Sequence, residues 1–141
     1  MHNSMLVHLL QFAGVLHLGL MCAGLMMPSA VQLPANLATL PPFLRQLFWV
    51  YYGFIGFCLI CFGALTFLMA PTLAEGTLLA RIVCLFLAGF WTLRLFAATF
   101  VFDLKPYLTT VYKRLGYYLL NTAFCLLPLV YLLAAWKGGK L

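Results

Sequence analysis

The sequence predicts an all-α polytopic membrane protein, an antiparallel bundle of four transmembrane helices that forms one domain over residues 1–141. Hydrophobic residues make up 66% of the chain and charged residues only 7%. An ordinary soluble domain has about 45–50% apolar residues and about 25% charged ones. A chain of 141 residues cannot bury so much apolar surface in a water-soluble core. The lipid bilayer is therefore its first expected partner.

Four apolar runs predict the spans, in the order Met5–Met27, Leu47–Ala70, Leu78–Phe102 and Leu115–Trp136. Each has about 20 residues or more, which is enough to cross a hydrocarbon core of about 30 Å. Because lipid offers no hydrogen-bond partners, the backbone groups must bond internally, and each run should be a helix. The first run is predicted to be a span and not a signal peptide, since it lacks a basic leader and its apolar stretch is too long.

Prolines and one capping pattern mark the boundaries of these spans. Pro28 is expected to close the first helix, and the uncharged segment from there to Leu44 is expected to be a loop or to lie on the bilayer surface. Thr72 and Glu75 have the spacing of a capping box for the third helix. Pro128 lies inside the fourth helix and should kink it.

The net charge of +6 indicates orientation in a membrane and not a nucleic-acid surface, because the basic residues stand mostly at the ends of apolar runs. With four spans, both termini lie on the same side. Four basic residues flank the opposite side and three the terminal side: Arg45, Lys105, Lys113 and Arg114 against Arg81, Lys137 and Lys140. This slight excess favours cytoplasmic connecting loops and external termini.

Arg94 is the most informative residue, because the apolar run Ile82–Phe102 around it contains no acid. An arginine at the centre of a membrane helix costs about 2.5–3.5 kcal/mol on insertion scales. The side chain could snorkel to the interface. It could instead be satisfied within the bundle, through cation–π contacts with Trp91 or Phe90 and a hydrogen bond to Asn121. Its third option is an anionic or carbonyl-bearing ligand, or an acid of another subunit.

Polar side chains from all four predicted spans share a similar depth. With a rise of 1.5 Å per residue, they lie between about 8 and about 15 Å from the side that carries the connecting loops. We therefore predict a ligand-binding set with one member from each span: Arg94, His17, Asn121 and Tyr52.

No catalytic residue, metal site or cofactor is predicted. His8 and His17 are nine residues apart and face opposite sides of the first helix, so they cannot jointly hold a metal ion or a haem. Cys58 and Cys61 have a C-x-x-C spacing, but in mid-span a free cysteine behaves as a small hydrophobe. Two acidic residues in the whole chain leave almost no machinery for acid–base hydrolysis.

The size, the four-span plan and the sparse charges resemble the small bacterial membrane proteins that include the DoxX-like families. The segment Leu40–Gly53, LPPFLRQLFWVYYG, resembles an uncharacterised bacterial family of small four-span membrane proteins. This resemblance implies a multi-pass protein of the bacterial inner (plasma) membrane. It carries over no activity and no site residue.

The sequence thus favours a non-enzymatic integral membrane protein that binds a lipophilic ligand or serves as an accessory subunit of a membrane complex. Arg94 would be its polar anchor. A quinone- or haem-linked redox subunit is one alternative, in which His17 relays a proton. A small transporter is another. Because four short spans enclose little volume, a homo-oligomer or a larger membrane complex is expected, and nucleic acid is not an expected partner.

Overall fold

The computed structural model describes residues 2–138, and all regular secondary structure in this range is helical. Four long helices dominate it: α1 (His2–Ala30), α3 (Pro42–Leu68), α5 (Leu78–Phe96) and α6 (Val111–Lys137). Each is long and apolar enough to cross a membrane, α5 together with the π-helical turn η1 (Ala97–Val101) that continues it. The predicted fold class is confirmed, and the chain is a multi-pass integral membrane protein.

Three short elements connect the long helices: α2 (Leu33–Ala38), α4 (Ala70–Ala74) and the 3-10 turn η2 (Lys105–Tyr107). The segment that was expected to be a loop between the first two spans therefore contains a helix. The prediction that Pro28 closes the first helix is wrong, because α1 continues to Ala30.

The predicted capping box of the third span is also wrong. Thr72 lies inside α4, and it is Thr77 that caps α5, with its Oγ1 accepting a hydrogen bond from the Ala80 backbone N–H at 3.2 Å. Gly76 precedes this cap with a φ of 70°, a left-handed conformation that glycine adopts without a steric penalty. The turn at Gly76 separates α4 from α5, so the cap had to follow it.

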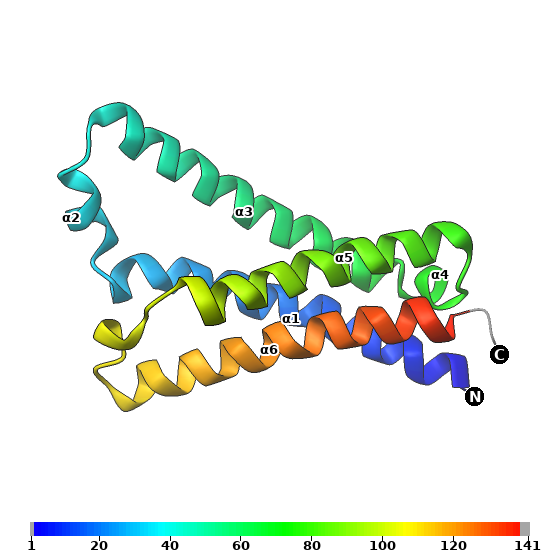
Figure 1. The fold of residues 1–141 in the computed structure, drawn as a ribbon. Coiled ribbons are helices and arrows are strands. Elements are labelled where there is room, and N and C mark those ends of the chain that lie inside the picture. The colour runs from blue at the N-terminus through cyan, green and yellow to red at the C-terminus, as the bar shows by residue number, and fades with distance from the viewer. Residues whose placement is uncertain (1, 139–141) are drawn as a thin grey trace.

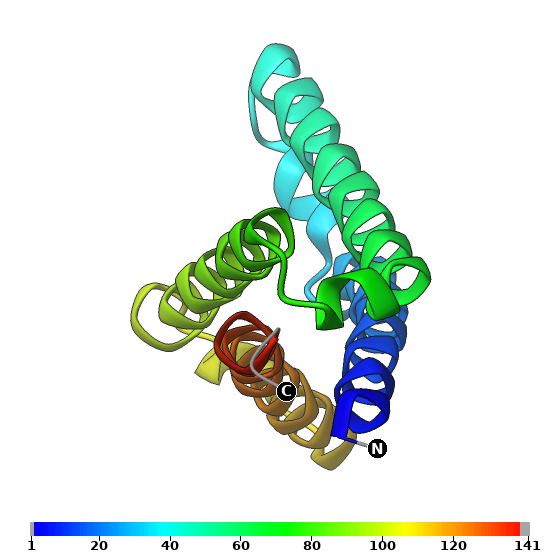
Figure 2. The same ribbon diagram turned by 90° about the vertical axis from the view of Figure 1, so that its right-hand side faces the viewer.

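The four long helices do not remain together over their whole length. The first turn of α1 and the last turn of α6 lie at the same end of the bundle, beside α4, and α3 leans away from the other helices towards α2 (Figures 1 and 2). Near α4, α3 packs closely on α1 through two glycines. A Cβ added to Gly14 would lie 2.8 Å from the Cβ of Phe67, and one added to Gly63 would lie 2.9 Å from the Cβ of His17.

The buried core is concentrated in the half of the bundle that contains α4. Buried residues of α1 run from Leu6 to Leu20, those of α3 are Gly63 and Thr66, and those of α6 run from Ala123 to Ala134. We call this part the closed half. The remainder, towards α2, is the open half. Within the described residues of α3, none before Gly63 is buried, because α3 diverges from its neighbours there.

Candidate functional site

His17 lies in the closed half, close to its border with the open half, with none of its surface exposed. Its Nε2 is 3.2 Å from Nε1 of Trp91, and its Nδ1 is 2.7 Å from the carbonyl oxygen of Ala13. An indole nitrogen can only donate and a carbonyl oxygen can only accept. The proton of this histidine must therefore be on Nδ1, and both ring nitrogens are occupied by protein partners.

A second hydrogen bond lies beside this histidine. The hydroxyl groups of Thr66 and Tyr131 are 2.7 Å apart, and the ring of Tyr131 is 6.3 Å from that of His17. His17, Thr66, Trp91 and Tyr131 are each at most 1% exposed. We call these four residues the buried polar cluster. Each long helix contributes one of them, so the cluster joins all four helices at the point where the closed half ends.

Arg94 is connected to this cluster through two aromatic rings. Trp91 stacks on Phe124 with ring centroids 5.7 Å apart, and the Arg94 Cζ atom lies 5.0 Å from the centroid of the same Phe124 ring. A second ring, that of Phe102, is 5.4 Å from Cζ. The cation–π partners are thus Phe124 and Phe102, in place of the Trp91 and Phe90 that the sequence suggested, because the Trp91 indole is turned to His17.

The guanidinium of Arg94 makes no polar contact within the described residues. Within residues 2–138 its recorded contacts are the two rings, and no hydrogen bond or ion pair engages it. Since Phe102 is eight residues further along the chain, the side chain extends towards the C-terminal end of its span. Cation–π contacts contribute about 0.5–2 kcal/mol each, which offsets part of the cost of the charge in lipid.

Arg94 lies on the inner face of α5 and is nevertheless exposed. It is seven residues after buried Leu87 and four before buried Ala98, and both spacings place residues on one side of a helix. In the closed half this face is covered by the other helices. At Arg94 the cover is incomplete, and in this half of the bundle α3 leans away from the other helices (Figure 1).

Tyr52 and Asn121 also occupy inward-facing helix positions in the open half. Tyr52 is eleven residues before Gly63 and therefore on the same face of α3, while Asn121 is seven residues before buried Pro128 on α6. Both side chains are half-buried. The hydroxyl of Tyr52 donates to the carbonyl oxygen of Gly24 on α1.

The four predicted site residues therefore fall into two groups. Arg94, Asn121 and Tyr52 lie on three different helices in the open half, whereas His17 belongs to the buried polar cluster of the closed half. Among the residues the structure describes, no hydrogen bond or ring contact joins any two of the four directly.

The sequence analysis missed the roles of Thr66, Tyr131 and Phe124. One signal pointed in their direction: Trp91 lies in the middle of its span, although tryptophan in membrane proteins is enriched at the interfaces. An indole so far from water needs an acceptor for its N–H, and His17 at mid-span of another helix could supply one.

The described residues contain no group of three or more histidine, cysteine or acidic side chains arranged to hold a metal ion. Comparison of the chain with protein-family models, with curated proteins and with solved structures found no match. Its function is therefore inferred from its own residues.

Proposed function

We propose that this chain is a non-enzymatic integral membrane protein that binds a lipophilic ligand in the open half, between α3 and the pair α5 and α6. Arg94 would hydrogen-bond a carboxylate or carbonyl oxygen of that ligand. One observation carries the proposal: Arg94 occupies an inward-facing helix position, yet it is exposed and its guanidinium contacts only aromatic rings in the described part of the chain.

The energetics favour an acceptor at this position. Two cation–π contacts leave the five N–H donors of the guanidinium without hydrogen-bond partners in a medium that supplies none. A hydrogen bond to a charged group contributes about 1.5–3 kcal/mol, which is comparable to the insertion cost of the arginine. The hydroxyl of Tyr52 already donates to Gly24, so Asn121 would supply the second polar contact.

The lean of α3 supports a ligand that arrives from the bilayer. The apolar side chains of α3 near Tyr52 are exposed, among them Phe54 and Ile55, so this stretch of α3 presents a surface that suits hydrocarbon. A molecule with a long apolar body and one oxygen-bearing head suits this environment, because its body replaces lipid while its head reaches the guanidinium.

The redox alternative receives no such support. A proton relay or an axial iron ligand would need a ring nitrogen of His17 that is free to exchange a proton or to bind the metal. Nδ1 is bonded to Ala13 and Nε2 to Trp91. We therefore propose that His17 holds the helices together within the buried polar cluster, and we propose no redox role for it.

Photo-crosslinking with a defined probe tests the proposal. The purified protein in detergent is irradiated with a long-chain fatty acid that carries a diazirine, and the labelled residues are mapped by mass spectrometry. We expect labels on α3, α5 and α6 in the open half. The Arg94→Leu variant should lose about tenfold in labelling, as expected from the loss of a charged hydrogen bond. Arg94→Lys should retain part of it.

Two controls sharpen this experiment. Arg45→Leu removes an equally charged and likewise exposed side chain at the start of α3, and its labelling should equal that of the wild type. The corresponding diazirine alcohol, which lacks the carboxylate, should label weakly. Equal labelling of wild type and Arg94→Leu would refute the ligand site. Release of a co-purifying protein by Arg94→Leu, without any change in labelling, would assign Arg94 to a subunit interface and end the ligand proposal.

A further inference from the structure

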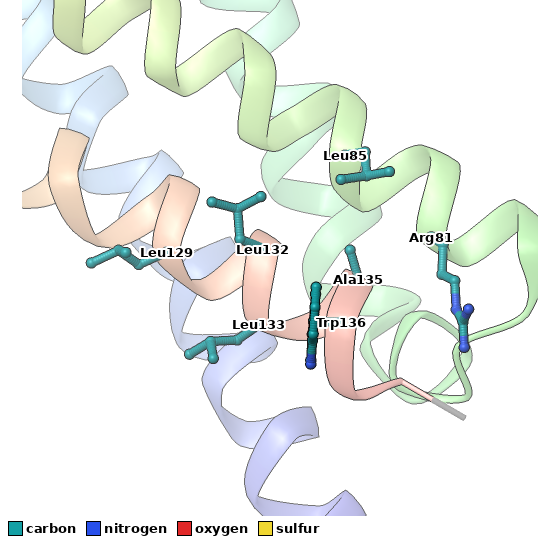
Figure 3. Close-up of a pocket in the computed structure, with 7 residues that line it drawn as sticks. All are labelled: Arg81, Leu85, Leu129, Leu132, Leu133, Ala135 and Trp136. Carbon is teal, nitrogen blue, oxygen red and sulfur yellow. The ribbon is translucent and has the colours of Figure 1, made fainter. Parts of the chain in front are cut away.

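A cavity of about 510 Å³, widely open to the outer surface of the bundle, lies between α5 and α6 in the closed half, at the other end of α5 from η1 (Figure 3). Its volume is within the range of about 300–1,000 Å³ that small-molecule pockets occupy. Its walls are almost entirely apolar, and they contain one charged side chain. The residues that matter are Arg81 and Leu85 of α5, and Leu129, Leu132, Leu133 and Trp136 of α6.

Arg81 is held in place at one end of this cavity. Its Nη2 donates to the carbonyl oxygen of Gly138 at 3.0 Å, which fixes the guanidinium against the end of α6. Its Nε is buried and has no hydrogen-bond partner among the described residues. A buried donor without an acceptor costs about 1–3 kcal/mol. The guanidinium is therefore fixed in position, although not all of its N–H donors have a hydrogen-bond acceptor.

The leucines of α6 that line the cavity lie progressively further from Arg81, towards the middle of the span. Leu129 and Trp136 are seven residues apart on α6, which corresponds to about 10 Å along the helix axis. In Figure 3 the leucines lie along α6 on one side of Trp136, and Arg81 lies on the other side. The cavity thus has a charged end and an apolar end, about as far apart as the head and the upper chain of an amphiphile.

The charged end lies at the level of the membrane surface. Arg81 is in the first turn of α5, just after the Thr77 cap, and Trp136 is one residue before the end of α6. Tryptophan is enriched at membrane interfaces, and basic pockets between helices at that level bind anionic head groups. Within residues 2–138, exposed Lys137 at the end of α6 and exposed Glu75 at the end of α4 are the other charged residues near this end of the cavity, so with Arg81 their balance is positive.

We propose that this cavity binds one anionic phospholipid, with its phosphate on Arg81 and an acyl chain along Leu85 and the α6 leucines. The lipid is favoured over free phosphate because the apolar wall leads away from the cation into the span. This site shares no residue with the open half, so it stands whether or not Arg94 binds a ligand.

Fluorescence quenching in vesicles tests the site, with Trp136 as the reporter. The Trp49→Phe background leaves Trp91, which is 1% exposed, and Trp136, which is 73% exposed. The protein is reconstituted into phosphatidylcholine that contains equal fractions of either brominated phosphatidylglycerol or brominated phosphatidylcholine. A basic residue near the surface attracts anionic lipid by a factor of about five, so we expect the anionic lipid to be preferred around Trp136 by about fivefold.

Two charge-removing variants separate a specific site from general attraction. Arg81→Gln should reduce the preference to about one, whereas Lys137→Gln, which removes an equally charged side chain outside the cavity, should retain most of it. Arg81→Lys keeps the charge and should retain part of it, which guards against a loss caused by misfolding. The part of the emission that neither brominated lipid quenches belongs to buried Trp91, and an unchanged size of this part would show that each variant is folded.

Several results would overturn the site. These are equal quenching by the two brominated lipids in the wild type, an unchanged preference in folded Arg81→Gln, and an equal loss in Arg81→Gln and Lys137→Gln. The Arg94→Leu variant separates this site from the ligand site of the proposed function. It should leave the preference at Trp136 intact, so that a failure of the open-half ligand site and a failure of the phospholipid site are read separately.

Discussion

Tyr52 of α3 donates its hydroxyl to the carbonyl of Gly24 of α1, which is the carbonyl that Pro28 leaves without a helical partner. A proline has no N–H, so the oxygen four residues before it loses its normal donor. In lipid such an oxygen would be costly, since no water replaces the missing bond. The proline in α1 thus creates an acceptor to which the leaning helix α3 is attached.

Tyr52→Phe should loosen the open half. The variant keeps the ring, which stacks on Phe48 with centroids 6.2 Å apart, but it removes the only donor to Gly24 recorded in the described residues. We expect a broader distribution of distances between spin labels placed at Ser29 on α1 and Gln46 on α3, in a background without the native cysteines. The matched control is Tyr51→Phe on the exposed face of α3. If Tyr52→Phe and Tyr51→Phe give the same distribution, the bond does not position α3.

Trp91→Phe should destabilise the closed half. The change removes the N–H that bonds to Nε2 of His17 and leaves that nitrogen buried without a partner, which costs about 1–3 kcal/mol. Thermal unfolding in detergent, followed by circular dichroism, measures the effect. Trp49→Phe, the same change at an exposed position of α3, should leave the midpoint almost unchanged. Similar midpoints for Trp91→Phe and Trp49→Phe would contradict the structural role of His17.

The hydroxyl pair of Thr66 and Tyr131 should couple α3 to α6. Either Thr66→Val or Tyr131→Phe leaves one buried hydroxyl unsatisfied, whereas the double variant removes both. A double-mutant cycle on the free energy of unfolding should therefore give a double variant less destabilised than the sum of the single ones, by about 0.5–1.5 kcal/mol. Strict additivity would show that the two hydroxyls do not interact in the membrane protein as purified.

Gly14→Ala should separate α1 from α3. A Cβ at this position would lie 2.8 Å from the Cβ and 2.9 Å from the backbone nitrogen of Phe67, and backbone atoms cannot yield cheaply. Overpacking of this kind costs about 1–3 kcal/mol. Gly19→Ala on the same helix has nothing within 4 Å of the added atom, and it should be neutral or stabilise α1 by about 0.5–1 kcal/mol. A higher unfolding temperature for Gly14→Ala than for the wild type would show that the two helices are not in close contact there.

The sequence predicted those features of the fold that depend on local composition. Four long apolar runs became four long helices, because a backbone in lipid has no alternative to internal hydrogen bonds. It failed where two local signals competed. Thr72 and Thr77 both precede the third span, and only the glycine turn at Gly76 decided in favour of Thr77. Pro28 was expected to end α1, but the helix continues for two more residues.

For the candidate site, the sequence alone determined which polar side chains are costly in lipid: His17, Arg94, Asn121 and Tyr52 each lie within an apolar run. Only the tertiary structure decided which of them meet a partner. His17 and Trp91 are 74 residues apart in the chain, and they bond because α6 packs against both α1 and α5 and so holds these two helices within reach of each other. Arg94, on the same face of α5 as the core, remains exposed in the half of the bundle where α3 leans away. Helix tilt and spacing arise from side-chain packing between helices, and no periodicity within one span records them.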